Sequence, residues 1–130
     1  MITLSVEELH QEGVKYYNGD GVKKDINKAI ECFEKAIAIG SPKSKRALGF
    51  VLYGNGRAWA AETAEQKRGV QLLEEAAAEG DRVAKEWYVD QYEYAAVGAW
   101  ILKLKFKSFD YEGTKQRAAL AKQYAKELKQ

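Results

Sequence analysis

The chain has 130 residues, of which 46% are hydrophobic, and its formal net charge at pH 7 is only +2. This balance of apolar and charged residues is typical of a folded protein and excludes intrinsic disorder. The length accommodates one domain or one short array of repeats, and no apolar run approaches the ~20 residues of a membrane-spanning helix.

The first 40 residues carry the start and stop signals of two helices. Ser5 and Glu8 have the spacing of a capping box, which predicts a helix from Ser5 to the glycine-rich turn at residues 18–21. Asp25 can cap a second helix, whose apolar residues recur at helical spacing until Gly40 ends it.

The next 40 residues repeat this arrangement. Ser41 followed by Pro42 predicts a third helix over about residues 42–52. A turn at residues 54–56 and a loop extension then precede Thr63, which forms a second capping box with Gln66. We expect the fourth helix to run from there to residue 80.

The signals after Gly80 are weaker. Asp81 can cap a fifth helix, and apolar residues at helical spacing would allow it to continue to Phe106. Residues 102–107 alternate apolar and basic side chains, which is also typical of a strand. Because a single strand would have no partner, we favour a helix or an irregular crossing. A final helix is predicted over about residues 111–129, with an inner stripe of Ala118, Ala121, Ala125 and Leu128.

Two parts of the chain repeat each other. Residues 13–21 are echoed by residues 49–56, and residues 28–40 by residues 68–80. Internal repeats of this length indicate stacked helix pairs. We expect a single repeat domain over residues 1–130, with repeat one at about 5–40, repeat two at about 41–80, and a divergent third unit with a helical cap at about 81–130.

The pattern GxxYxxGxGVxxDxxKAxxxFxKAxxxG, from Gly13 to Gly40, resembles the Sel-one-like repeat family, relatives of the tetratricopeptide repeats. The resemblance implies an all-α fold, namely a short right-handed α/α solenoid of about three helix-turn-helix repeats with a divergent C-terminal helical cap. It also implies a protein-interaction scaffold and not an enzyme. The matched positions determine the fold, so the resemblance supplies no binding residues.

Groups suited to catalysis or metal binding are few. His10 is the only histidine, and we expect it to be a surface residue. Cys32 is the only cysteine; we expect a small buried side chain on the inner face of the second helix. It cannot form an internal disulfide, and the N-terminus does not resemble a signal peptide, which favours a cytoplasmic protein. We expect no enzymatic activity, no cofactor and no metal.

Aromatic residues are candidates for partner binding. Positions 7, 11 and 14 after each closing glycine are expected to form one exposed row. The row comprises Gln11, Lys15 and Asn18 in the first unit, Ala47, Val51 and Gly54 in the second, and Trp87, Gln91 and Tyr94 in the third. Trp87 and Tyr94 either anchor a partner protein or pack under the C-terminal segment. Trp59, in the loop extension, either contacts a partner or covers the end of the fourth helix.

The C-terminal segment is basic. Residues 103–130 contain eight basic and three acidic residues, whereas residues 1–102 contain 13 basic and 16 acidic residues. This segment is either a solvated cap of the array or a patch for an acidic protein, nucleic acid or a membrane surface. The candidate patch residues are Lys103, Lys105, Lys107, Lys115, Lys122 and Lys126.

Together these features favour a non-enzymatic protein–protein interaction module. We expect a small dedicated binder, such as an inhibitor, an immunity protein or an adaptor, that is a monomer or a weak homo-oligomer. The alternative is a nucleic-acid or anionic-surface binder that uses the lysine-rich C-terminal segment. Self-association through an open end of the array is a third interpretation.

Overall fold

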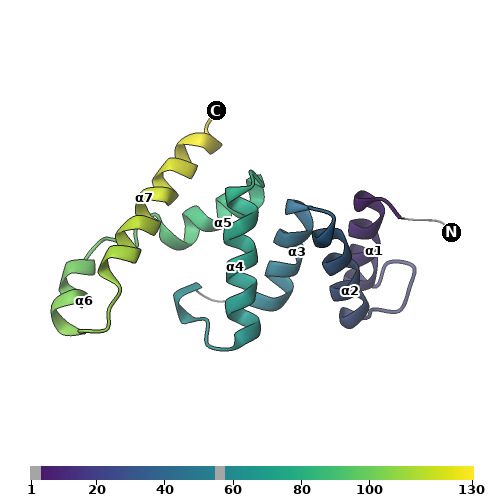
Figure 1. The fold of residues 1–130 in the computed structure, drawn as a ribbon, viewed down its shortest axis with the longest axis horizontal. Coiled ribbons are helices and arrows are strands. Elements are labelled where there is room, and N and C mark those ends of the chain that lie inside the picture. Colours follow the sequence, from purple (N-terminus) through teal and green to yellow (C-terminus); the bar gives the residue numbers. More distant parts are fainter. Residues whose placement is uncertain (1–3, 55–57) are drawn as a thin grey trace. The chain divides into compact units, whose positions relative to one another are not determined.

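The computed structural model describes residues 4–54 and 58–130, and every regular element in these ranges is helical (Figure 1). The chain divides into two compact units, residues 1–81 and residues 82–130. The first unit contains α1 (Val6–Asn18), α2 (Ile26–Ala38), α3 (Pro42–Tyr53), the short 3-10 turn η1 (Ala58–Ala60) and α4 (Ala64–Ala78). The second contains α5 (Arg82–Tyr92), α6 (Ala99–Lys105) and α7 (Tyr111–Leu128).

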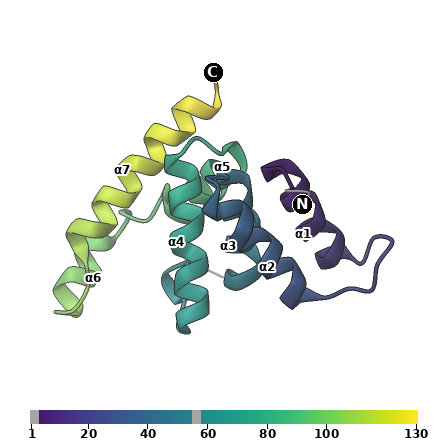
Figure 2. The same cartoon turned by 45° about the vertical axis from the view of Figure 1, so that its right-hand side comes forward.

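The all-helical architecture agrees with an α/α solenoid. In the first unit α1 contacts α2, α2 contacts α3, and α3 contacts α4, so that consecutive helices pack against each other (Figures 1 and 2). The handedness of the array, the count of three repeats and the single domain over residues 1–130 stay predictions.

The helices of the first unit begin at the expected residues. Asp25 Oδ1 accepts a hydrogen bond from the Lys28 backbone N–H at 3.1 Å. Thr63 forms a complete capping box with Gln66, whereas Ser5 forms only half of one. Its Oγ accepts from the Glu8 N–H, but the Glu8 carboxylate accepts from the Ser5 hydroxyl and not from its backbone. These bonds satisfy backbone donors that a helix start leaves free.

Both repeats end in the same way. Gly40 and Gly80 adopt φ values of +97° and +102°, in the left-handed region that favours glycine. The residue after each glycine donates a backbone hydrogen bond back to the preceding helix. The Ser41 N–H donates to the Ala36 carbonyl, and the Asp81 N–H donates to the Ala76 carbonyl. This closure turns the chain directly into the next helix.

Close approach of backbones determines how the helices of the first unit pack. A Cβ added to Gly69 of α4 would lie 2.6 Å from the Tyr53 backbone nitrogen and 2.7 Å from the Gly49 carbonyl oxygen. Leu48 and Leu73 are completely buried at this contact. Burying a leucine side chain stabilises the fold by about 1.5–3 kcal/mol, so the α3–α4 contact contributes strongly.

The second unit corrects the expected fifth helix. Helix α5 ends at Tyr92, and α6 begins only after Gly98, which adopts a φ of +75°. Between them, short-range turn bonds such as Ala95 N–H to the Tyr92 carbonyl replace the helical pattern. A series of turns therefore interrupts the helix that the apolar spacing predicted. The expected helix in residues 102–107 is confirmed as far as Lys105.

Aromatic rings join α5 to α7. The ring centroids of Tyr88 and Tyr124 lie 5.3 Å apart in an edge-on arrangement, and those of Tyr88 and Tyr92 lie 4.7 Å apart. The expected inner stripe of α7 is confirmed at Ala118 and Ala121, which are buried. Tyr124 is a further buried residue on this side of α7, which the predicted stripe did not include.

In Gly69→Ala the added methyl group meets two backbone atoms that can move only if α3 and α4 separate, which costs about 1–3 kcal/mol. Alanine gains ~1 kcal/mol over glycine inside a helix, so we expect a net decrease of up to about 2 kcal/mol in the free energy of unfolding. Urea unfolding followed by circular dichroism measures the change. The exposed α4 residue Gln71 provides the matched control Gln71→Ala, which should shift the free energy by less than about 0.5 kcal/mol. Equal stability of both variants would contradict the close packing.

Candidate functional site

A buried polar chain links α1 to α3. His10 Nδ1 lies 3.0 Å from Ser44 Oγ, which in turn accepts a hydrogen bond from the Ser41 hydroxyl at 3.1 Å. The His10 ring also packs on Phe33, with 5.6 Å between the ring centroids. His10 is only 4% exposed, so the expected surface position is wrong. The inward-facing side of α1 includes this residue because Ser44 offers it a polar partner.

An exposed ion pair also joins the same two helices. Lys43 Nζ of α3 lies 3.2 Å from Glu7 Oε1 of α1. These residues are 36 positions apart, which equals the spacing of Gly13 and Gly49. Helices α1 and α3 therefore lie side by side in the same direction, with equivalent turns facing each other.

An apolar hollow of about 170 Å³ lies farther along these helices. We call it the α1–α3 groove, and its lining residues are Val14, Tyr17, Phe33, Ala47, Phe50 and Val51. Tyr17 and Phe50 are 42% and 37% exposed, whereas Phe33 is buried and the other lining residues are half-buried. The groove is smaller than the ~300–1,000 Å³ pockets of small-molecule ligands. Its size suits one or two apolar side chains of a partner.

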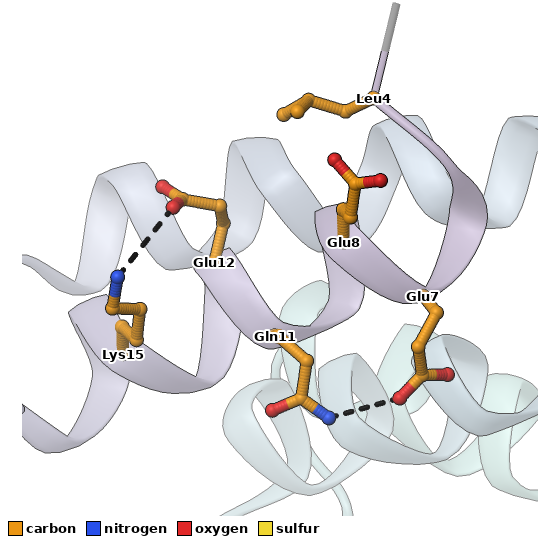
Figure 3. Close-up of a pocket in the computed structure, with 6 residues that line it drawn as sticks. All are labelled: Leu4, Glu7, Glu8, Gln11, Glu12 and Lys15. Atoms are coloured by element: carbon orange, nitrogen blue, oxygen red, sulfur yellow. Dashed lines mark hydrogen bonds and ion pairs between the residues drawn. The ribbon is translucent and has the colours of Figure 1, made fainter.

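A second hollow of about 260 Å³ lies on the exposed side of α1 and is acidic (Figure 3). Its lining residues are Leu4, Glu7, Glu8, Gln11, Glu12 and Lys15. Gln11 donates a hydrogen bond to Glu7 at 2.9 Å, and Lys15 forms an ion pair with Glu12 at 3.8 Å. The hydrogen bond from Gln11, together with Lys43, lowers the pKa of Glu7 below its ordinary value. Glu7 therefore stays ionised at neutral pH.

The loop between α1 and α2 carries the opposite charge. Lys23, Lys24 and Lys28 line a third hollow together with Tyr16, Val22 and Asp25. The Lys24 ammonium lies 5.7 Å from the centroid of the Tyr17 ring, which also lines the α1–α3 groove. This cation–π contact holds the exposed tyrosine ring in place at the end of the groove.

The three residues of the expected row in the third unit differ in their exposure to solvent. Trp87 is only 8% exposed and packs edge-on against Tyr88 and Tyr92, so its expected exposure is wrong. Tyr94 is 75% exposed, and Gln91 is half-buried, with its amide donating to Asp90. The aromatic contacts of α5 turn Trp87 inward, which removes it as an accessible anchor.

The other expected binding residues are lysines and one tryptophan. The lysines at positions 103, 105, 107, 115, 122 and 126 are all exposed. The Lys103 and Lys115 ammonium groups converge on the Tyr111 ring, at 4.6 and 5.0 Å from its centroid. Trp59 has its backbone in η1, but its side chain lies outside the described residues, as does the expected turn at residues 55–56.

The repeat spacing after the closing glycines did not predict the two exposed rings of the α1–α3 groove. It placed Ala47 and Val51 in the exposed row, and both line the groove. In the first unit it chose Gln11 and Lys15, which instead line the acidic hollow. The available signal was the repeat itself, because Val14 and Phe50 are equivalent apolar residues 36 positions apart.

The described residues contain no group of three or more histidine, cysteine or acidic side chains arranged to hold a metal ion. Cys32 is half-buried, and its burial raises the pKa of the thiol, which disfavours the reactive thiolate. None of the helices in residues 4–54 and 58–130 is both long enough and apolar enough to cross a membrane.

The consecutive packed helices define an all-helical repeat protein. The Sel1 repeat model matches residues 13–41 and 42–81, and the chain therefore belongs to the Sel1 repeat family. Sel1 repeats are generally protein–protein interaction modules and are typically non-catalytic. Comparisons with curated proteins and with solved structures found no match.

Burial of His10 predicts a pH-dependent stability. Desolvation, with a smaller effect of Lys43, lowers the pKa of His10 below its ordinary value of 6.5, while Glu7 opposes the shift. The unfolded chain therefore binds a proton first as the pH falls, so the free energy of unfolding should decrease below about pH 6.5.

Urea unfolding between about pH 5 and pH 7.5 tests this dependence, because the carboxylates titrate mainly below that window. His10→Gln should give a flatter profile than the wild type, since glutamine has no proton to take up. Identical slopes for the two proteins would contradict the burial of a neutral His10.

Proposed function

We propose that this protein is a non-enzymatic interaction module that holds one protein target in the α1–α3 groove. The observation that carries the proposal is the pair of exposed rings, Tyr17 and Phe50, beside a small apolar hollow. Aromatic side chains at the centre of an interface commonly contribute most of the binding free energy. The membership of the chain in the Sel1 repeat family supports the same class of function.

The charges around the groove indicate the chemistry of the target segment. Glu7 shares α1 with Val14 and lies two turns from it, on the same side of the helix. Glu8 and Glu12 add further carboxylates to the exposed side of α1. Lys24 lies beside Tyr17 at the other end of the groove, so a segment with one apolar anchor between a basic and an acidic residue would match this surface.

The size of the groove favours a dedicated binder. A hollow of about 170 Å³ takes one or two side chains, and its walls come from packed helices of two consecutive repeats. Such a site recognises one anchor well and adapts poorly to others. An inhibitor, an immunity protein and an adaptor each act by covering one surface of one target, and we propose a role of this kind.

The proposal is tested by affinity capture with the full chain as bait and the proteome of the native host as prey. The double variant Tyr17→Ala/Phe50→Ala should weaken binding of the captured target at least about 30-fold, corresponding to ~2 kcal/mol. Titration calorimetry with the purified target measures the change in Kd.

A matched control removes two exposed apolar side chains that do not line the groove. Ile26 and Ile39 are 37% and 56% exposed, and Ile26→Ala/Ile39→Ala should retain the target with less than about threefold loss. Equal loss in both double variants would show that the groove is not the binding site. Recovery of nucleic acid and no protein at physiological salt would contradict the proposal altogether.

A further inference from the structure

An exposed apolar surface surrounds α6 in the second unit. We call it the α6 patch, and it consists of Tyr94, Val97, Trp100, Ile101, Leu104 and Phe106. Val97 and Leu104 are each 78% exposed, and Trp100 is 59% exposed. Single exposed apolar residues are ordinary on protein surfaces, but here these six and Leu102 are all exposed within 13 consecutive positions.

Helix α6 turns its apolar side outward. At 3.6 residues per turn, Trp100, Ile101 and Leu104 fall within an arc of about 100° on one side of the helix. On the opposite side Ala99 is completely buried, whereas Leu102 is 40% exposed. A helix that only completes a folded core has the reverse arrangement, with its polar side exposed.

Lysines border this apolar side. By the same helical spacing, Lys103 and Lys105 lie at its two edges, and Lys107 follows directly after the helix. No acidic residue occurs between Tyr94 and Phe109 in the sequence. The patch therefore combines apolar side chains with a border of lysines.

The acidic residues that follow the patch are held by other cations. Asp110 lies 3.6 Å from Arg117, and Glu112 lies 3.9 Å from Lys115. Lys103 is held over the face of the Tyr111 ring and not by a carboxylate. The positive border of the α6 patch is thus available to an anionic surface.

We propose that the α6 patch docks on an anionic lipid surface. Apolar and aromatic side chains on one side of a helix, bordered by lysines, are the pattern of interfacial helices that lie in the membrane plane. Trp100 suits the boundary between headgroups and acyl chains, where its ring is partly buried and its indole N–H meets polar groups. The lysine stems cover apolar surface while their ammonium groups reach lipid phosphates and carboxylates.

Charge complementarity favours lipid over the other occupants. A second copy of the chain would place the same patch on both sides of a two-fold contact, which brings lysines near lysines without an acidic partner. A nucleic acid would neutralise the lysines but would leave Val97 and Leu104 in water. An anionic bilayer satisfies the charge and buries the apolar side chains together.

Co-sedimentation of the full chain with phosphatidylcholine vesicles, with and without phosphatidylserine, tests the proposal. We expect binding to the vesicles that contain phosphatidylserine and at least tenfold weaker binding to those that lack it. Lys105→Gln/Lys107→Gln should weaken binding to the anionic vesicles about 25-fold, at about fivefold per lysine. Trp100→Ala/Leu104→Ala should weaken it at least tenfold, because the apolar contribution is lost.

The matched charge control lies on α7. Lys122 is 11 residues beyond Tyr111, about 16 Å along the helix axis, and Lys126 is farther still. Both distances exceed the ~10 Å screening length at physiological salt. Lys122→Gln/Lys126→Gln should therefore change binding by less than about twofold. Equal loss in both lysine pairs would overturn the assignment to α6, because general charge would explain the binding.

Three further results would overturn the proposal in favour of another occupant. One is a dimer, seen by light scattering without lipid, that Trp100→Ala/Leu104→Ala converts to a monomer. Another is binding of a labelled single-stranded oligonucleotide with no binding to anionic vesicles. The third is loss of a captured protein target in the α6 double variant while the wild type does not sediment with vesicles. Retained circular dichroism in the lysine variants ensures that lost binding is not lost folding.

Discussion

The first unit depends on contacts in which a glycine of one helix meets the partner helix directly. Gly13 faces the Phe33 ring, and Gly49 faces Leu73 at the equivalent position of the next repeat. In the second pair Gly69 brings the two backbones together as well. Since any side chain at these points would separate the helices, the close approach permits complete burial of Leu73 and near-complete burial of Phe33.

The groove is a consequence of this packing. When the second helix of each repeat lies close against the first, α1 and α3 become neighbours and their equivalent turns face each other. The pair Glu7–Lys43 and the buried contact between His10 and Ser44 hold this register at one end. The apolar hollow with Tyr17 then remains at the other end, supported by rigid helices and not by a loop.

The two units present surfaces of different chemistry. The α1–α3 groove is apolar with carboxylates on the neighbouring side of α1, whereas the α6 patch is apolar with a lysine border. The proposed occupants differ accordingly, a protein segment for the first surface and an anionic lipid for the second. All residues of each surface belong to one compact unit.

Local signals in the sequence determined the helix boundaries of the first unit, because caps such as Asp25 and turns such as Gly40 depend only on neighbouring residues. The repeat spacing likewise indicated helix pairs. Tertiary structure decided which sides of the helices are covered, since helical periodicity alone does not say what packs against each side. It buried His10 beside Ser44 and Trp87 among tyrosines, and it left the apolar side of α6 exposed. The binding surfaces therefore emerge only from packing between elements distant in the chain.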